Sequence, residues 1–329
     1  MSPTISRRRS LQALGLALTA TLSLAACGGG SDSGSTSGSG PVSITVIRST
    51  GATFEPLFIA QNQGIFTKHG LKVKLVEAAA GGGSTSVPRV LKGEAQFAAA
   101  DVAGLANAVS QGLPVKATVT TQLSTSTDPV SDGLLVAKDS SIKSYADLAG
   151  KKVGLSAIGG FPQAFVTIGA KKAGISAEKI QFVQLPTASL TDALKKGTVD
   201  AIISFASFYD AAKSAGMVPI GNGSNDLPGV PQSLFFASTQ WLAKNQATAK
   251  KFSEAMADAF TYANAHADQV RAIDKQYTQL TAAYIDSRTI QKFGGTPDKD
   301  QIKAVADALV DLKVIKKAPS YDDLYWNAS

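Results

Sequence analysis

The chain of 329 residues carries 32 basic and 25 acidic residues, two His and one Cys, which gives a formal net charge of +7. Residues 1–27 hold three Arg and no acidic residue, so the remainder has 29 basic and 25 acidic residues, a balance of only +4. This mild balance, without a basic run interleaved with aromatics after Arg9, argues against a nucleic-acid partner. One Cys excludes an internal disulfide framework. Two His leave little material for a metal centre or a Ser-His-Asp arrangement, so we predict no catalytic residue, metal or cofactor.

The N-terminus has the pattern of an export signal. Arg7–Arg9 precede an apolar run over Leu11–Ala26, and Leu24-Ala25-Ala26-Cys27 closes that run. These last four residues resemble the lipobox of bacterial lipoproteins. The resemblance implies cleavage before Cys27, diacylglycerol on its sulfur, and a protein tethered outside the cytoplasmic membrane. A transmembrane helix is the alternative, but the run falls short of the roughly 20 residues that such a helix needs.

The residues on either side of this motif bear on export and tethering. Ser6-Arg7-Arg8 followed by Leu11 resembles a twin-arginine signal, although Ser10 replaces the usual aromatic residue, so the export route stays open. Gly28–Val42 is a Gly/Ser-rich linker, which as a random coil spans roughly 20 Å. We expect a flexible tether between the lipid and the folded part.

From Ser43 onward, short strands alternate with helices. In the first half the pattern predicts strands at Ser43–Arg48, Lys72–Glu77, Ala95–Ala100 and Val115–Thr121, and helices at Pro56–Phe66, Thr85–Lys92 and Val102–Gln111. In the second half it predicts strands at Lys152–Leu155, Ile180–Gln184 and Val199–Ser204, and helices at Phe161–Ala173, Leu190–Lys196 and Phe208–Ala215. Beyond Trp241 the chain is almost wholly helical, with Ala249–Ala265 the clearest amphipathic segment. The alternation predicts an α/β fold with mainly parallel sheets.

A weak internal repeat indicates two α/β units of the same kind. Lys92-Gly93-Glu94-Ala95-Gln96-Phe97 and Lys196-Gly197-Thr198-Val199-Asp200-Ala201 each end a helix at Gly and enter an apolar strand. Gly supplies the left-handed residue that stops the helix, and the preceding Lys suits the negative end of the helix dipole.

Several blocks of the chain resemble, in the right order, a known family. The blocks are Phe54–Ala60, Gln63–Leu71, Leu91–Ala99, Ser144–Gly154 and Leu194–Ile202. They resemble the nitrate, sulfonate, taurine and thiamine-precursor binding family of ABC transporter solute-binding proteins. The resemblance covers about Ile44 to Trp241.

This resemblance implies a type II periplasmic-binding-protein fold, in which two α/β lobes are joined by two crossing strands and close on a ligand. We expect residues 43–134 and 234–329 to form lobe 1, and residues 135–233 to form lobe 2. The candidate crossing strands are Gly133–Lys138 and Ser233–Ser238.

In open parallel sheets, ligands bind beyond the carboxyl ends of the strands, where helices begin. Three loops meet this condition: Arg48–Glu55, Ala80–Thr85 and Ser156–Phe161. Their glycines let the backbone approach a ligand, and the helix N-termini that follow favour negative charge. The Gly-rich turns are Gly81–Gly83 and Gly159-Gly160, and neither is followed by the Gly-Lys-Ser/Thr tripeptide that a P-loop nucleotide site needs.

The candidate ligand-binding residues follow from these loops and from the neighbouring strand ends. They are Arg48, Thr50, Gly51, Phe54, Gly82, Gly83, Ser84, Thr85, Asp101, Gly159, Gly160, Phe161, Thr187, Ser204 and Phe205. Each has a structural alternative: Arg48 as a solvated strand end, the Phe residues as core, and Asp101, Thr187 and Ser204 as helix caps.

We therefore predict a lipid-anchored, extracytoplasmic, monomeric solute-binding protein that delivers a small organic anion to the permease of an ABC importer. Sulfonates, taurine, nitrate and carboxylates are the anions that the resemblance suggests. One alternative is a neutral pyrimidine precursor of thiamine, stacked on Phe161 or Phe205. Another is a lipoprotein that senses a ligand for a membrane receptor, and an enzyme on this fold is disfavoured. The sequence does not determine which ligand is bound.

Overall fold

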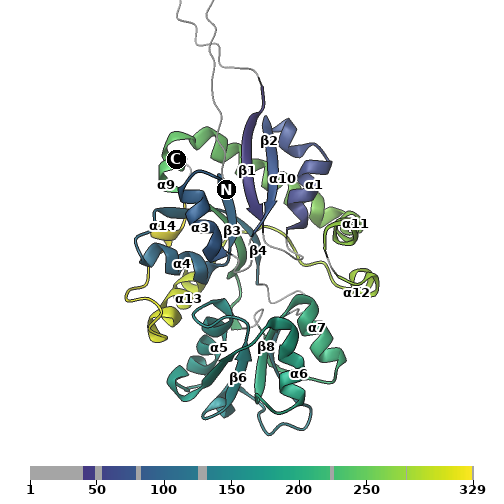
Figure 1. Cartoon of the computed structure of the whole chain (residues 1–329), viewed down its shortest axis with the longest axis vertical. Coiled ribbons are helices and arrows are strands. Elements are labelled where there is room, and N and C mark those ends of the chain that lie inside the picture. The colour runs from purple at the N-terminus through teal and green to yellow at the C-terminus, as the bar shows by residue number, and fades with distance from the viewer. Residues whose placement is uncertain are drawn as a thin grey trace, which may run out of the picture. The chain divides into compact units, whose positions relative to one another are not determined.

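The computed structural model describes residues 40–48, 54–78, 83–124, 132–222, 226–278 and 280–327 (Figure 1). The expected signal segment with Cys27, and the linker up to residue 39, lie outside the described residues. Residues 40–329 form one unit by their internal contacts. Within the described residues, no helix is both long and apolar enough to cross a bilayer.

The first sheet has five strands in the order β2-β1-β3-β10-β4. They are β1 (Val42–Arg48), β2 (Leu71–Glu77), β3 (Phe97–Ala100), β4 (Val115–Leu123) and β10 (Pro231–Ser238). β1 pairs in parallel with β2 and β3, whereas β10 runs antiparallel between β3 and β4. Ile44, Val46 and Ile47 of β1 are buried, and because the adjacent residues Val46 and Ile47 point to opposite faces, both faces of the sheet are covered.

The second sheet has the order β7-β6-β8-β5-β9. Its strands are β5 (Asp132–Val136), β6 (Lys152–Leu155), β7 (Gln181–Gln184), β8 (Ala201–Phe205) and β9 (Val218–Gly221). β6 pairs in parallel with β7 and β8, and β5 runs antiparallel between β8 and β9. The two sheets share one topology, which confirms the predicted α/β class with mainly parallel sheets.

The weak sequence repeat marks equivalent places in the two sheets. Gly93 and Gly197 both have positive φ, at +78° and +68°, and they precede β3 and β8. These strands occupy the third place in their respective sheets. The repeat is therefore structural, and each Gly ends its helix in the left-handed conformation that favours this residue.

Both changes of sheet occur earlier in the chain than predicted. β5 pairs on both edges within the second sheet, and β10 pairs on both edges within the first. The chain therefore crosses between Leu123 and Asp132, and again between Gly221 and Pro231. The candidate crossing strands Gly133–Lys138 and Ser233–Ser238 enter one sheet each, and the expected lobe boundaries fall inside strands. An apolar run identifies a buried strand, but it does not reveal which sheet the strand joins.

The connecting helices agree with the sequence pattern except at one point. They are α1 (Glu55–Asn62), α2 (Ile65–Lys68), α3 (Gly83–Leu91), α4 (Val102–Ser110), α5 (Phe161–Lys172), α6 (Leu190–Lys195) and α7 (Ala206–Ser214). The single helix predicted over Pro56–Phe66 is wrong: Gly64, with φ of +67°, separates α1 from α2. Short 3₁₀ turns cover Tyr145–Leu148, Ala177–Lys179 and Thr187–Ser189.

The C-terminal part is helical, as predicted. Its helices are α9 (Thr239–Lys244), α10 (Gln246–Ala265), α11 (Ala267–Tyr277), α12 (Ala282–Ser287), α13 (Lys299–Asp311) and α14 (Tyr321–Leu324). The apolar face of α10 packs on the first sheet, where the ring of Phe252 stacks on Phe97 with ring centroids 4.1 Å apart.

Helix α13 ties the two sheets together on one side. It contacts α4 of the first lobe and α5 of the second, and Leu309 shares a buried core with Leu105 and Phe165. Two exposed ion pairs flank this contact, Lys171 with Asp311 and Lys313 with Glu178. The two lobes are thus joined by packing along α13 as well as by the two crossing segments.

The packing around Tyr145 yields a test of this fold. The ring of Tyr145 lies between Gly169 of α5 and Gly221, and a Cβ at either position would come within 2.4 Å of ring carbons. The Tyr145 hydroxyl also donates a 2.7 Å hydrogen bond to Asp226, so the ring has no room to retreat. We expect Gly169→Ala to lower the free energy of unfolding by about 1–3 kcal/mol, because overpacking outweighs the better helix propensity of Ala.

Gly104→Ala in α4 is the matched control. A Cβ at Gly104 would have its closest neighbour at 3.6 Å, an ordinary contact. This variant should gain up to about 1 kcal/mol from helix propensity. Urea unfolding of both variants measures the difference, and equal changes of the same sign would contradict the packing described around Tyr145.

Candidate ligand-binding site

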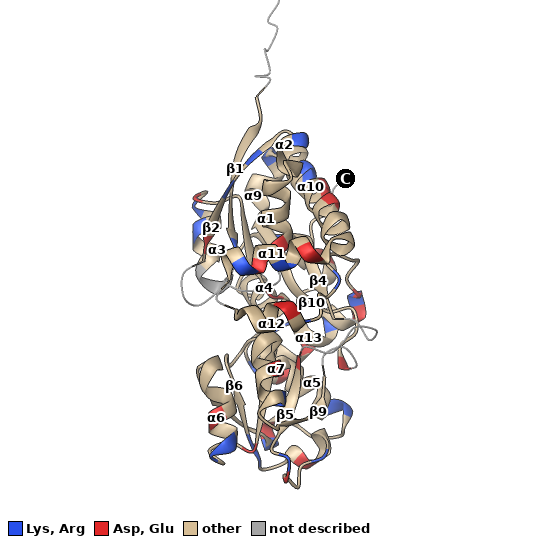
Figure 2. Ribbon diagram, turned by 90° about the vertical axis from the view of Figure 1, so that its right-hand side faces the viewer, with Lys and Arg blue, Asp and Glu red and all other residues tan. Residues whose placement is uncertain are grey.

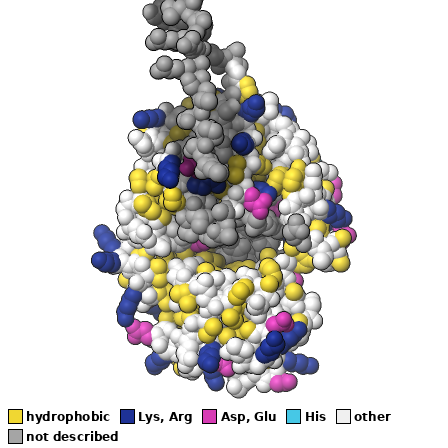
Figure 3. Space-filling model, viewed as in Figure 1, with side chains coloured by type: hydrophobic (Ala, Val, Ile, Leu, Met, Phe, Trp, Pro, Cys, Tyr) yellow, Lys and Arg dark blue, Asp and Glu magenta, His cyan; other side chains and the backbone are white. Residues whose placement is uncertain are grey.

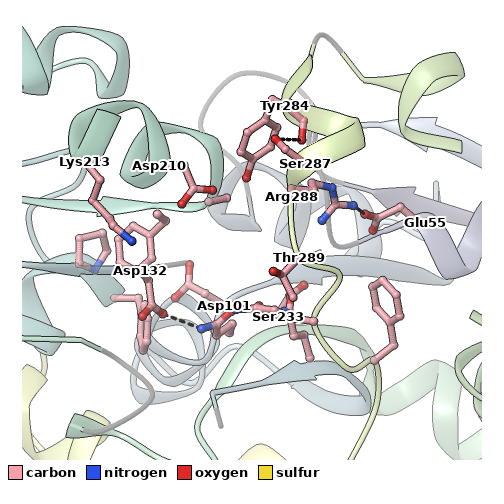
Figure 4. A pocket seen from close by; sticks show the side chains of 18 of the residues that line it. Glu55, Asp101, Asp132, Asp210, Lys213, Ser233, Tyr284, Ser287, Arg288 and Thr289 are labelled. Carbon is pink, nitrogen blue, oxygen red and sulfur yellow. Dashed lines mark hydrogen bonds and ion pairs between the residues drawn. The ribbon is translucent and has the colours of Figure 1, made fainter. Parts of the chain in front are cut away.

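A cavity of about 610 Å³ lies between the two lobes. Figure 4 shows that side chains from both sheets and from α12 point into it, and Figure 3 shows hydrophobic side chains along the boundary between the lobes. The lining residues among those described are Glu55, Asp101, Gln122, Asp132, Phe161, Pro162, Phe205, Ala206, Asp210, Lys213, Ser214, Gln232, Ser233, Tyr284, Ser287, Arg288, Thr289, Gln291 and Phe293.

The topology explains why these residues meet. Asp101 follows β3, Gln122 is the last residue but one of β4, and Phe205 ends β8, so all three lie at carboxyl ends of parallel strands. Asp132 is the first residue of β5 and Gln232 the second residue of β10, and the amino ends of these antiparallel strands lie at the same edges. The cavity therefore occupies the edge that strand polarity predicts for a ligand.

The first residues after the two crossings are joined by hydrogen bonds at this edge. The Gln232 side-chain amide donates to the Asp132 carboxylate at 2.7 Å and to the Ser124 hydroxyl at 3.1 Å. The Ser124 backbone also pairs with Val230 and Gly229. These bonds connect the ends of both crossing segments directly beneath the cavity.

Two buried polar groups of the lining have no hydrogen-bond partner among the described residues. They are the side-chain oxygen Oε1 of Gln122 and the hydroxyl of Ser233. The Gln122 amide nitrogen, by contrast, donates to Gln291. Since buried polar groups are normally satisfied, these two atoms are suited to contact a bound polar molecule.

Arg288 is held by two buried carboxylates. Its Nη2 lies 2.5 Å from Glu55 Oε1, and its Nε donates to Asp274 Oδ2 at 2.8 Å. Glu55 is 2% exposed, Asp274 0% and Arg288 10%. Burial opposes the charge of Arg288, but the two carboxylates outweigh burial and raise the pKa of its guanidinium. The cluster carries two negative charges for one positive charge.

Asp101 has a structural contact and also faces the cavity. Its carboxylate caps α4 by accepting a 2.8 Å hydrogen bond from the Gly104 amide. Burial raises the pKa of Asp101, although backbone donors oppose that shift. The capping alternative considered above is thus present, and Asp101 remains available to a ligand on the cavity side.

The second lobe supplies an aromatic wall. The rings of Phe161, at the start of α5, and Phe205, at the end of β8, have centroids 6.1 Å apart. Ala206, directly after Phe205, has a φ of +49°, in the left-handed region that costs an L-residue about 1–2 kcal/mol. The sharp turn from β8 into α7 thus places Phe205 at the cavity at the expense of backbone strain.

At the cavity mouth, α7 of the second lobe lies next to α12 of the first in two perpendicular views (Figures 1 and 2). Tyr284 of α12 faces Asp210 of α7 (Figure 4). Burial and then the Asp210 carboxylate raise the pKa of the Tyr284 hydroxyl. Lys213, also on α7, is exposed, and its ammonium lies 5.2 Å from the centroid of the Tyr209 ring.

The charges of the described lining do not favour an anion. Four carboxylates, on Glu55, Asp101, Asp132 and Asp210, face two cations, Lys213 and Arg288. Near the N-terminus of α5, two positions offer no N–H to a ligand. The Gly159 amide donates to Gln163 at 2.7 Å, and Pro162 has no N–H.

Among the described residues, no group of three or more His, Cys, Asp or Glu side chains could hold a metal ion.

Some of the predicted site residues lie at the cavity. Asp101, Phe161 and Phe205 line it. Gly160 immediately precedes Phe161 as the N-cap of α5. Ser204 immediately precedes Phe205, and its buried hydroxyl has no hydrogen-bond partner among the described residues.

Other predicted residues lie away from the described lining. Arg48 pairs with Glu77 at 3.2 Å and stacks over the Phe58 ring, because Arg48 and Glu77 are register partners in β1 and β2. Phe54 is core, with its ring edge-on to Phe235. The Cβ position of Gly159 faces Val314, and Thr187 sits half-buried in a 3₁₀ turn.

Six further predicted residues, or their side chains, lie outside the described part of the chain. Thr50, Gly51 and Gly82 lie outside the described residues. Gly83, Ser84 and Thr85 open α3, and their side chains are outside the described part.

Sequence reasoning missed most of the polar lining. Asp132 and Gln232 had a usable signal, since each lies in the first two residues of an antiparallel strand at the ligand edge. Arg288 and Tyr284 had none, because they belong to a helical region that no strand end precedes. The pairing of Arg288 with Glu55 joins residues 233 positions apart.

Two known proteins are similar in sequence to a little under half of the chain. It is 29% identical over 153 residues to the 4-amino-5-hydroxymethyl-2-methylpyrimidine phosphate synthase of Legionella pneumophila, covering 46% of this chain and 45% of that protein. It is 32% identical over 148 residues to a putative thiamine biosynthesis protein of Haemophilus influenzae, covering 45% of this chain and 44% of that protein. The chain thus spans a little under half the length of each relative.

The fold has well-matched solved neighbours. The periplasmic aliphatic sulphonate binding protein SsuA of Escherichia coli superposes with a TM-score of 0.73 at 20% identity, covering 87% of this chain and 92% of that one. This likeness confirms the periplasmic-binding-protein fold. The model of the family described as NMT1/THI5 like matches residues 52–270. The resemblance drawn from the sequence blocks is therefore confirmed, and the chain belongs to the NMT1/THI5-like family.

Proposed function

We propose that the protein is a solute-binding protein of an ABC importer, and that its ligand is an uncharged or weakly basic aminopyrimidine of the thiamine-precursor type. The observation that carries this proposal is the described cavity lining. It combines three Phe rings with four carboxylates, and its buried cation, Arg288, is already compensated by Glu55 and Asp274.

This lining suits an aminopyrimidine on three counts. A flat heterocycle can pack against the rings of Phe161 and Phe205. Its exocyclic amine donates hydrogen bonds, which the Asp101 and Asp132 carboxylates accept. Its ring nitrogens and any hydroxyl accept hydrogen bonds, which donors such as Arg288 supply. A sulfonate would meet mostly like charge at this lining.

The relatives support the same ligand class. One is named as a synthase of a methylpyrimidine phosphate, and the other as a putative thiamine biosynthesis protein. Binding without turnover is our proposal for this chain, in line with the sulphonate-binding protein that shares its fold. The organic anion expected from the sequence is the rival ligand.

The setting of the protein is part of the proposal. The lipobox at Leu24–Cys27 and the Gly/Ser linker support tethering by lipid at the outer face of the cytoplasmic membrane, and we propose that the tethered protein is a monomer. There it would pass its ligand to permease subunits. The alternative partner is a membrane receptor that reads the ligand-bound state.

Calorimetry with matched ligands tests the proposed ligand class. The panel consists of 4-amino-5-hydroxymethyl-2-methylpyrimidine, taurine, an alkanesulfonate and nitrate. We expect binding of the pyrimidine, a rise in unfolding temperature with its concentration, and no binding of the three others. Tighter binding of a sulfonate or of nitrate than of the pyrimidine would overturn the proposal.

Two substitutions of Asp101 separate its effect on protein stability from its effect on ligand binding. Asn caps a helix about as well as Asp, so Asp101→Asn should keep α4 intact while weakening pyrimidine binding roughly ten- to hundredfold, through loss of a charged acceptor. Asp101→Ala should lose the cap as well, at about 0.5–2 kcal/mol of unfolding free energy.

The pH dependence of stability gives an independent reading of Asp101. Burial raises its folded pKa above the unfolded value, so this carboxyl favours the folded state below its unfolded pKa, and that contribution is lost as pH rises through the folded pKa. Asp101→Asn should remove this dependence. An unchanged pH profile in urea unfolding, together with unchanged affinity, would remove Asp101 from the site.

Cys27→Ala tests the anchor. The variant should lack the lipid mass and remain in the aqueous phase after detergent partition, while binding ligand as the parent does. Lipid mass retained on the variant would show that Cys27 is not the anchor.

A further inference from the structure

Arg288 presents a free guanidinium edge to the cavity. Its Nη2 and Nε are engaged by Glu55 and Asp274, whereas its Nη1 has no hydrogen bond within the described part of the chain. In Figure 4 the Arg288 side chain reaches the cavity from the side opposite Asp210, and its guanidinium lies at the cavity wall. A ligand acceptor at this wall would meet an N–H donor.

The surroundings of Arg288 hold this edge in place. Asp274 lies on α11 and Glu55 begins α1, so two separate helices fix the guanidinium. Arg271 supports the segment that carries it, because its Nη2 donates to the Arg288 carbonyl and its Nε to the Ile285 carbonyl, both at 3.1 Å. The donor is therefore presented with little loss of conformational freedom on binding.

We propose that Glu55 and Asp274 determine specificity by making Arg288 a donor for neutral acceptors only. This inference rests on the proposed function and deepens it, since it predicts a hydroxyl or ring nitrogen at Arg288 and excludes a phosphate or sulfonate there. An Arg paired with one carboxylate is formally neutral as a pair. Paired with two, it forms a cluster of charge −1 that still donates a hydrogen bond but repels an anion.

The size of this effect follows from the geometry. A further carboxylate roughly 6–10 Å from an anionic ligand group, on the other side of the guanidinium, opposes binding of that group roughly ten- to hundredfold at an effective dielectric constant near 20. A neutral hydroxyl carries no net charge, so the same carboxylate changes its binding little. The ratio of affinities for a neutral ligand and its anionic counterpart therefore reports on the second carboxylate.

The test uses 4-amino-5-hydroxymethyl-2-methylpyrimidine and its phosphate ester, measured by calorimetry on the parent protein, Glu55→Gln and Asp274→Asn. Both substitutions keep an oxygen that accepts from Arg288 and remove one negative charge. We expect the parent to prefer the alcohol strongly, and each variant to reduce that preference roughly ten- to hundredfold, mainly by tighter binding of the phosphate ester. Two variants are used so that a folding defect in one leaves the other informative.

Glu77→Gln is the matched control. Glu77 also pairs with an Arg, Arg48, but outside the described lining, so the affinity ratio should not change. An unchanged ratio in both Glu55→Gln and Asp274→Asn would overturn the inference.

Measuring the binding of ethanesulfonate and of inorganic phosphate tests the role of Glu55 and Asp274 without relying on the pyrimidine. Neither anion should bind the parent, and both should gain affinity in the two variants. Failure of the parent to bind any pyrimidine would contradict the proposed function, whereas these anions would still decide the role of Glu55 and Asp274.

Discussion

The twofold crossing of the chain between two sheets is the constraint on which the rest of the structure depends. Each crossing inserts one antiparallel strand, β5 or β10, into a sheet whose other strands are parallel. As a result, the amino ends of these two strands lie beside the carboxyl ends of their neighbours. Asp132 and Gln232 thereby join Asp101 and Phe205 around one cavity, and the Gln232–Asp132 hydrogen bond links the lobes at its base.

The fold and the ligand are separate questions in this protein. The likeness to a sulphonate-binding protein at 20% identity fixes the architecture, and the side chains at the sheet edges decide what is bound. Here the second carboxylate on Arg288 is the decisive feature. Glu55 on α1 and Asp274 on α11 offset the positive charge that an anion would require, yet they leave Nη1 of the Arg288 guanidinium without a hydrogen bond within the described residues. A buried ion cluster of this kind is weak evidence for stability, so its role is better sought in recognition.

The sequence was informative where local patterns determine structure. Strand and helix periodicity predicted most elements, and strand ends with the loops that follow them led to Asp101, Phe161 and Phe205, which line the described cavity. It was less informative where contacts between residues far apart in the chain determine the structure. Arg48 was expected near a ligand, but register pairing with Glu77 engages it. Glu55 and Arg288 meet across 233 positions through helix packing, which no short-range pattern records. The sequence likewise did not indicate which of the two sheets β5 joins and which β10 joins, since buried strands look alike in sequence.

Mass spectrometry of the small molecule released from freshly purified protein tests the central claim most directly. Release by denaturation, followed by accurate mass and fragmentation, identifies the ligand without any assumption about its class. The account predicts a nitrogen heterocycle without phosphate or sulfonate, bound in up to one copy per chain. A sulfonate, a phosphate ester or another organic anion as the main released species would contradict it.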